Sequence, residues 1–225
     1  GHDFAAPALA SGASVLLLER QAWIQRRAAL EGALRSSGGA VLAVEAVLPA
    51  FQSLARAKRQ RHPGLLRVGI TGSSGKTTTK EIVASILSRA GRVAMNAGNL
   101  NSDQGLARSL FGIEGDEKYG VVEMWMNRVG EMDELAGMYE PQFALITNVG
   151  TAHIGILGSR RAIAEEKKKI FSRFDGRQLA FIREDEEYKS LLVAGLRGEL
   201  VEFGERSTAG FRGAKDLGLD GWAID

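Results

Sequence analysis

The feature that most constrains this chain is a short glycine- and serine-rich loop that ends in lysine and threonine: Gly72-Ser73-Ser74-Gly75-Lys76-Thr77. An apolar run of strand length, 66–71, comes directly before it, and a segment with helical periodicity follows. In this context, backbone N–H groups at the helix N-terminus bind phosphate, the lysine neutralises phosphate charge, and the threonine hydroxyl can bind Mg²⁺. We therefore predict that a nucleotide binds here, with Thr78 included in the site. The alternative is a glycine-rich turn with a surface lysine.

The loop and the helix after it each have one further feature. The loop lacks the first glycine of the G-x-x-x-x-G-K-[ST] pattern, because Ile70 stands at that position. The helix predicted after the loop carries apolar residues that we expect to face the core: Ile82, Val83, Ile86, Leu87 and Ala90.

Strand-like apolar runs alternate with helix-length segments from residue 65 onward. The runs span 66–71, 92–96, 120–124, 143–148 and 178–182. This alternation predicts an α/β fold of the P-loop type, with a mostly parallel sheet covered by helices on both faces. Because ligands in such folds bind beyond the carboxyl ends of the strands, we expect the functional residues to gather at that edge.

A smaller α/β unit is expected in the first 62 residues. Runs 13–18 and 40–44 have strand length, and each is followed by a helical segment. The second segment, 46–61, has an expected core face and an expected basic surface; the core face is Leu48, Phe51, Leu54 and Ala55, and the surface is Arg56, Lys58 and Arg59. His62-Pro63-Gly64 then suggests a boundary between domains 1–62 and 63–225. Residues 221–225 are predicted to form one more strand.

Composition excludes several classes of protein. Apolar residues make up 44% and charged residues 25%, as in ordinary globular proteins, and no run approaches the length of a membrane helix. A net charge of +2 is too small to suggest nucleic acid or an anionic membrane as a partner. The chain has no cysteine, so its chemistry must come from oxygen and nitrogen groups, and a cytoplasmic setting fits.

Two residues follow strands of the expected sheet at the edge where the loop lies. Glu123 ends the run 120–124, where a carboxylate could hold a divalent cation, although an acidic residue at a strand end is more often only solvated. His153 follows the run 143–148 and is a candidate catalytic or metal-binding residue. A single histidine is more often structural.

Lys167 lies in the middle of an apolar helical stripe. In the segment 159–174 the stripe consists of Ile163, Ile170, Phe171 and Phe174, and the helical period places Lys167 among them, whereas Lys168 and Lys169 are expected to face solvent. Burial disfavours the charged form of an amine, so we expect a lowered pKa and a reactive neutral amine. The alternative is a side chain whose ammonium reaches out to water.

The polar segment 96–105 follows the expected strand 92–96. Its asparagines and glycines are explained by turn chemistry. Because it lies next to the phosphate loop, Asn99 and Asn101 are also candidates for substrate contact.

Several spaced motifs, in order along the chain, resemble the Mur ligase family. They are the run 71–81, Gly98-Asn99-Leu100-Asn101, Glu123 with Gly130-Glu131, Thr147-Asn148 with Ala152-His153, Gly158-Ser159, and Lys167 with Ile170-Phe171. The similarity extends from residue 1 to about residue 175. Ser73-Ser74 favours the branch that joins D-alanyl-D-alanine to UDP-N-acetylmuramoyl-tripeptide.

The resemblance implies an ATP-dependent amide ligase of peptidoglycan precursor synthesis that acts through an acyl phosphate. It implies that Lys76 contacts the terminal phosphates, that Thr77 and Glu123 hold one Mg²⁺, and that His153 serves a second. Lys167 would become a carbamate that supports the second metal ion. The partners would be the two small-molecule substrates, with no nucleic acid and no membrane, and the protein would be a monomer.

The resemblance also has departures and alternatives. Trp125, Ala107 and Lys169 replace residues common in the family, and Trp125 is expected to crowd the crevice. Parts of the N-terminal and central domains and a whole C-terminal domain are expected to be missing, so the chain alone is expected to be inactive. Other possibilities are a folylpolyglutamate- or cyanophycin-synthetase-type ligase, or a nucleotide-binding module without ligase activity.

Overall fold

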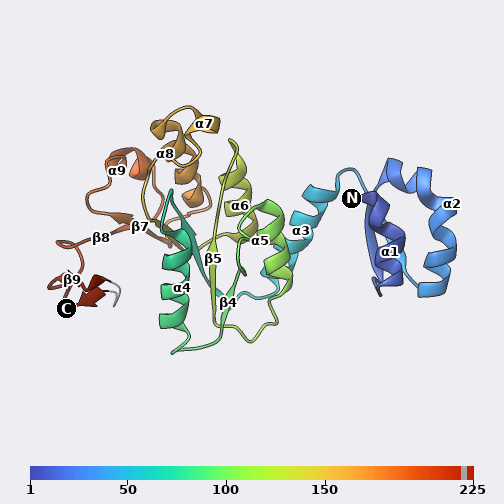
Figure 1. The fold of residues 1–225 in the computed structure, drawn as a ribbon, viewed down its shortest axis with the longest axis horizontal. Helices are drawn as coiled ribbons and strands as arrows, with labels where there is room; N and C mark the ends of the chain where they lie inside the picture. The colour runs from blue at the N-terminus through green and yellow to red at the C-terminus, as the bar shows by residue number, and fades with distance from the viewer. Residues whose placement is uncertain (219–221) are drawn as a thin grey trace. The chain divides into compact units, whose positions relative to one another are not determined.

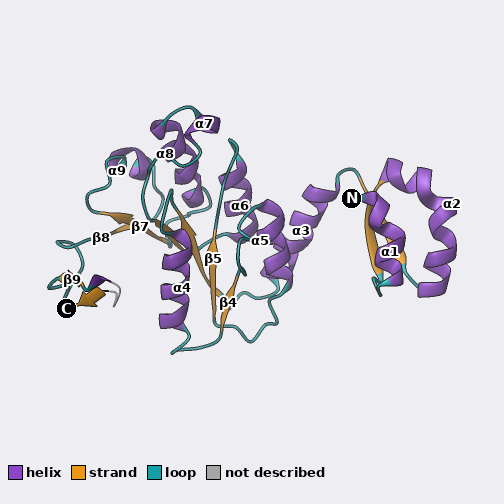
Figure 2. Ribbon diagram, in the orientation of Figure 1, coloured by secondary structure: helices purple, strands orange, loops and turns teal. Residues whose placement is uncertain are grey.

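The computed structural model describes residues 1–218 and 222–225, and Figures 1 and 2 show its helices and strands. The chain divides into two compact units, Gly1–Ala55 and Arg56–Asp225. The division falls inside helix α3 (Val47–Gln60), a few residues before the boundary expected at residues 62–64.

The first unit is a small βαβ arrangement. It contains a 3-10 turn (His2–Phe4), α1 (Ala5–Ala10), β1 (Val15–Glu19), α2 (Arg20–Ser37), β2 (Ala40–Val44) and the start of α3. Strands β1 and β2 pair in parallel, from Val15 opposite Ala40 to Glu19 opposite Val44. Gly38 ends α2 with φ 65°, a left-handed conformation that glycine adopts without strain. The strands and helices expected in this part of the chain are therefore present.

The second unit is built on a six-stranded sheet in the order β4-β5-β3-β6-β7-β8, in which every pairing is parallel. The strands are β3 (Leu66–Thr71), β4 (Val93–Met95), β5 (Tyr119–Glu123), β6 (Phe143–Ile146), β7 (Leu179–Arg183) and β8 (Glu199–Phe203). Five of them lie where the sequence predicts strands. The prediction missed β8, because its sequence Glu-Leu-Val-Glu-Phe is short and interrupted by acidic residues.

Helices flank this sheet, which confirms the α/β class (Figure 2). They are α4 (Lys76–Leu87), α5 (Asp103–Phe111), α6 (Glu131–Tyr139), α7 (Ile154–Leu157), α8 (Arg160–Lys168) with a 3-10 turn (Lys169–Phe171), and α9 (Lys189–Val193). Helix α4 packs on β3 and β5, with Ala84 against Ile70 and Val121 in one apolar cluster. This packing fixes the start of α4 at the carboxyl end of β3.

The predicted core face of α4 is partly wrong. Ile82 and Ile86 are 55% and 65% exposed and Ala90 is also exposed, whereas Lys80 and Ala84 are buried. Val83 and Leu87 do pack against the core. The inward face is thus rotated toward the side of the helix that carries Lys80, whose buried ammonium donates to Asn96 O.

In helix α3 two side-chain positions also differ from expectation. Leu54 is exposed, and Arg59 is buried rather than at the surface. Arg59 donates from Nη1 to Glu140 Oε2 at 2.7 Å, so a carboxylate compensates the buried guanidinium.

The end of the chain forms a two-stranded antiparallel ribbon, β9 (Ala214–Asp216) with β10 (Trp222–Ile224). The strand predicted at 221–225 corresponds to β10, while residue 221 lies outside the described residues. Across 1–218 and 222–225, no helix has the length and apolar character needed to cross a bilayer.

Candidate functional site

The phosphate loop connects the carboxyl end of β3 to the start of α4. Gly75 precedes α4 with φ 76°, and its left-handed backbone directs the chain into the helix. Gly72 is packed so closely that a Cβ there would lie 1.8 Å from Oγ1 of Thr147, the residue after β6. The loop therefore requires glycine at these two positions for geometric reasons.

Hydrogen bonds tie the two serines of the loop to the segment that follows β6. The Ser73 N–H donates to Asn148 O at 3.0 Å, and the Ser74 N–H donates to Asn148 Oδ1 at 3.1 Å. Thr147 Oγ1 donates to Ser74 O at 2.6 Å, and the Gly150 N–H donates to Ser73 Oγ at 2.8 Å. The loop is thus held in one shape by the neighbouring strand, as a preorganised phosphate site needs to be.

Lys76 turns back over this loop. Its Nζ donates to Gly72 O at 3.0 Å. Burial lowers its pKa below the ordinary lysine value, and the nearby Glu123 carboxylate opposes that shift. The ammonium therefore lies between the loop and Glu123, where a phosphate group could replace the Gly72 carbonyl as its partner.

Glu123 is a buried carboxylate at this edge of the sheet, held by two side chains. It is only 3% exposed. Thr77 Oγ1 donates to its Oε2 at 2.7 Å, and Asn101 Nδ2 donates to its Oε1 at 2.9 Å. The interpretation of Glu123 as a solvated strand end is therefore wrong.

His153 is held in an unusual backbone conformation. Its φ is 70°, in the left-handed region that non-glycine residues seldom occupy. Its ring packs edge-on against the Trp125 ring, with centroids 5.2 Å apart and an interplanar angle of 76°. Trp125 thus fills the space beside His153. Burial lowers the pKa of His153, and the positive charges of Lys167 and Lys76 lower it further.

Lys167 is buried, at 2% exposure, and the stripe around it is buried as predicted. Burial, assisted by the charge of Lys76, lowers its pKa to about 7. Among the described residues, no carboxylate lies at ion-pair distance from its amine. The alternative in which the ammonium reaches solvent is wrong. Lys76, His153 and Lys167 act on one another electrostatically, so the ends of two strands, β3 and β6, and helix α8 bring them to one region.

The two asparagine candidates have different positions. Asn101 contacts Glu123, whereas the Asn99 side chain is exposed. Thr78, the last residue assigned to the phosphate loop, is also exposed. Neither Asn99 nor Thr78 takes part in the hydrogen bonds around Glu123.

Sequence reasoning missed three buried polar residues next to these candidates: Lys80, Asn96 and Glu166. Glu166 accepts from the N–H groups of Gly130 and Met132 at 2.9 and 3.1 Å, and it pairs with Lys169 at 2.6 Å. It therefore joins α8 to the start of α6. Lys169, expected to face solvent, is half-buried through this pair. The sequence contained a signal for Glu166, because this residue directly precedes Lys167 in a turn of the helix that is buried.

The side chains here fit Mg²⁺. Glu123 and Thr77 offer a carboxylate and a hydroxyl side by side, and hard cations prefer oxygen ligands. His153 can offer a neutral imidazole nitrogen, because its pKa is lowered. Lys167 cannot bind a cation as an ammonium, but it would do so as a carbamate, and a pKa near 7 leaves much of its amine neutral and able to react.

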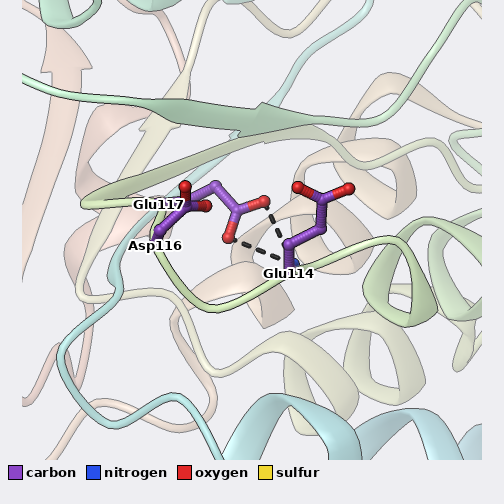
Figure 3. A group of neighbouring side chains, drawn as sticks. All are labelled: Glu114, Asp116 and Glu117. Atoms are coloured by element: carbon purple, nitrogen blue, oxygen red, sulfur yellow. Dashed lines mark hydrogen bonds between the residues drawn. The ribbon is translucent and has the colours of Figure 1, made fainter.

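A cluster of three acidic residues lies away from the site around Lys76 and Glu123. Glu114, Asp116 and Glu117 lie close together before β5, at the opposite end of that strand from Glu123 (Figure 3). The Glu117 carboxylate accepts from the N–H groups of Glu114 and Gly115, and Arg92 pairs with Glu114 and Asp116. These contacts satisfy the acidic groups, so the cluster is a turn with its own counter-charge.

Comparison with known proteins identifies the class. Residues 70–220 match the family model described as the Mur ligase middle domain. This match, together with the geometry above, shows that the chain belongs to the Mur ligase family.

Several of the similar proteins carry the names of one branch of that family. The chain is 40% identical over 238 residues to the UDP-N-acetylmuramoyl-tripeptide–D-alanyl-D-alanine ligase of Treponema pallidum, covering 99% of the chain and 50% of that protein. A crystal structure of MurF from Acinetobacter baumannii superimposes with a TM-score of 0.84 at 28% identity, covering 99% of this chain and 49% of that one. The crystal structure of MurF from Thermotoga maritima in complex with ADP superimposes with a TM-score of 0.74 at 26% sequence identity. The match covers 90% of this chain and 50% of that one. The chain thus spans about half the length of these relatives.

Proposed function

We propose that the gene product to which this chain belongs is an ATP-dependent ligase that joins D-alanyl-D-alanine to UDP-N-acetylmuramoyl-tripeptide in peptidoglycan precursor synthesis. The names of its relatives support this choice of substrates, and the ADP complex of the Thermotoga maritima protein supports the nucleotide. Both substrates are small molecules. The cysteine-free composition suits a cytoplasmic reaction.

One observation carries the proposal: the buried amine of Lys167, with a pKa of about 7, lies in the electrostatic reach of Lys76 and His153. A phosphate-binding module needs the loop lysine but has no use for a second, buried lysine beside it. A neutral amine can add carbon dioxide to give a carbamate, with loss of one proton. That reaction turns a costly buried cation into an anion and a ligand.

Five of the candidate side chains then have a role in nucleotide or metal binding. Lys76 and the loop N–H groups bind the terminal phosphates of ATP. Thr77 and Glu123 hold one Mg²⁺, and His153 and carbamylated Lys167 hold a second. Bound Mg²⁺ would offset the negative charge that develops on the transferring phosphoryl group.

The proposed reaction has two steps. A carboxylate oxygen of the tripeptide attacks the γ-phosphorus of ATP, the bond to ADP breaks, and an acyl phosphate forms. The amine of D-alanyl-D-alanine then attacks the acyl carbon, the C–N bond forms, and inorganic phosphate leaves while the amine loses a proton. Phosphoryl transfer depends mainly on positioning and charge stabilisation. The rigid loop supplies positioning, Lys76 supplies positive charge, and Glu123 with Thr77 would hold the Mg²⁺ that adds to it.

Phosphate release by the complete gene product tests this proposal. With ATP, Mg²⁺ and UDP-N-acetylmuramoyl-tripeptide, we expect sustained release only when D-alanyl-D-alanine is also present. Glutamate with a folate substrate, in place of the two peptidoglycan substrates, tests the folylpolyglutamate-type alternative. Turnover that depends on neither peptidoglycan substrate would refute the proposal and favour a nucleotide-binding module without ligase activity.

A further inference from the structure

Helix α4 carries a lysine that none of the proposed roles uses. Lys80 is 1% exposed, although lysine is seldom fully buried without a partner. Its Nζ donates to Asn96 O at 2.8 Å and pairs with Glu81 Oε1 at 3.1 Å. Burying an ammonium costs free energy, so a buried lysine of this kind needs a reason beyond stability.

Asn96, the residue that Lys80 contacts, uses its side-chain amide to bond the main chain of β5 and of the loop that follows β4. Its Oδ1 accepts from the Glu123 N–H at 2.9 Å, and its Nδ2 donates to Glu123 O and Leu100 O, each at 2.9 Å. Asn96 is fully buried. The Asn96 side chain thus bonds both main-chain groups of Glu123, its N–H and its carbonyl.

These two hydrogen bonds from Asn96 take the place of β4–β5 pairing at Glu123. The β4–β5 ladder ends at Met95 opposite Val121, so Glu123 has no main-chain partner from β4. On the other side, β3 pairs with β5 as far as Ile70 opposite Glu123. The Asn96 amide therefore supplies the hydrogen bonds that a longer β4 would give, and it does so at the residue whose carboxylate meets Thr77.

Lys80 and Thr77 lie one turn apart on α4 and contact the same region. Thr77 Oγ1 bonds the Glu123 carboxylate, while Lys80 bonds the residue that holds the Glu123 main chain. We infer that Lys80 and Asn96 are positioning residues that fix the Glu123 carboxylate, relative to the phosphate loop, in the geometry that binds a divalent cation. The identity of that cation rests on the proposed function, but the hydrogen-bonded geometry does not.

Binding of Mn²⁺, as a spectroscopic substitute for Mg²⁺, tests the inference without the ligase reaction. The complete gene product with ADP is titrated with Mn²⁺ and followed by electron paramagnetic resonance. Lys80→Met and Asn96→Asp are each expected to weaken Mn²⁺ binding by about tenfold or more, since displacements near 1 Å matter at such sites. Affinity for ADP without metal is expected to stay within about twofold.

Matched variants separate positioning from a general loss of stability. Glu81→Gln removes only the negative charge of the exposed partner of Lys80, and it is expected to bind Mn²⁺ as the wild type does. Lys80→Arg keeps a donor and is expected to recover part of the loss. Each variant is scored after thermal unfolding shows that it is folded, and Asn96→Asp carries the test if Lys80→Met does not fold.

Two different failures are distinguishable. Unchanged Mn²⁺ affinity in folded Lys80→Met and Asn96→Asp, whatever their melting temperatures, would overturn the inference. Absence of substrate-dependent phosphate release by the wild type would overturn the proposed function, and it would leave the Mn²⁺ result standing on its own.

Discussion

The two ends of β5 carry carboxylates in opposite circumstances. Before the strand, three acidic residues gather in a turn, where Arg92 and backbone N–H groups satisfy them (Figure 3). After it, a single buried Glu123 is held by Thr77 and Asn101, next to Lys76. The difference teaches that the number of carboxylates does not make a binding site. What matters is that one carboxylate is held in place next to groups that also address a ligand.

The largest expected effect on turnover comes from removing the ammonium of Lys76, which lies near Glu123. Lys76→Ala should reduce phosphate release by the complete gene product by on the order of a thousandfold, because the terminal phosphates lose their counter-charge. Arg92→Ala removes the cation that pairs with the acidic cluster before β5, and its rate of phosphate release should stay within about twofold of the wild-type rate. Normal nucleotide binding and turnover in Lys76→Ala would show that the phosphate loop is an ordinary turn.

The carboxylates themselves give the most direct comparison. Glu123→Gln should reduce turnover by about a hundredfold or more and raise the Mg²⁺ concentration needed for half-maximal rate, because an amide is a weak ligand for a hard cation. Glu117→Gln makes the same chemical change at the far end and should leave the rate unchanged. Equal effects of the two substitutions would remove the distinction drawn between the two ends.

Lys167→Ala should reduce turnover by about tenfold to a hundredfold, since the second metal position loses its carbamate. Short carboxylates such as acetate should restore part of the rate if a carbamate is the working group. Lys168→Ala on the same helix is the control. Full activity in Lys167→Ala would exclude this residue from the site.

The lowered pKa of the Lys167 amine also predicts how the stability of the uncarbamylated protein depends on pH. Its amine titrates near pH 7 in the folded protein but near 10.5 when unfolded, so between these values the unfolded chain binds more protons. The free energy of unfolding should therefore rise with pH over this window, by up to about 1.4 kcal/mol per pH unit from this group. Urea unfolding of Lys167→Met at pH 7 and 9 should show that this contribution is lost, and an unchanged slope would contradict it.

The smallest effect expected is structural. Glu166→Ala should lower the free energy of unfolding by about 1–3 kcal/mol, because the N–H groups of Gly130 and Met132 lose their buried acceptor. Its neighbour Glu165, exposed and paired with Arg161, provides the control, and Glu165→Ala should cost about 0.5 kcal/mol or less. Urea denaturation measures both, and equal losses would show that Glu166 contributes no more than a surface carboxylate.

The sequence predicted the sheet and the candidate residues at its carboxyl edge because their signals are local. An apolar run before a Gly-Lys-Thr loop places Lys76, and helical periodicity places Lys167 inside. The face of α4 was not predictable in the same way, because the number of apolar residues favoured Ile82 and Ile86. The interior instead accommodates Lys80 because Asn96 offers it a carbonyl.

Roles that depend on pairs distant in sequence were missed for the same reason. Glu166 is recognisable only when the start of α6 lies beside it, and Asn96 only when β4 is seen to stop short of Glu123. These contacts join residues more than 25 positions apart. Periodicity in one segment carries no information about them.

The fit of Gly72 against Thr147 has an evolutionary consequence. Because a methyl group at position 72 would overlap the threonine hydroxyl, which itself bonds Ser74, the two positions cannot drift independently. Among descendants of this protein, an alanine at 72 beside an intact threonine at 147 would mark a lineage in which the loop follows a different backbone path. Inspecting two letters of a sequence would be enough to recognise it.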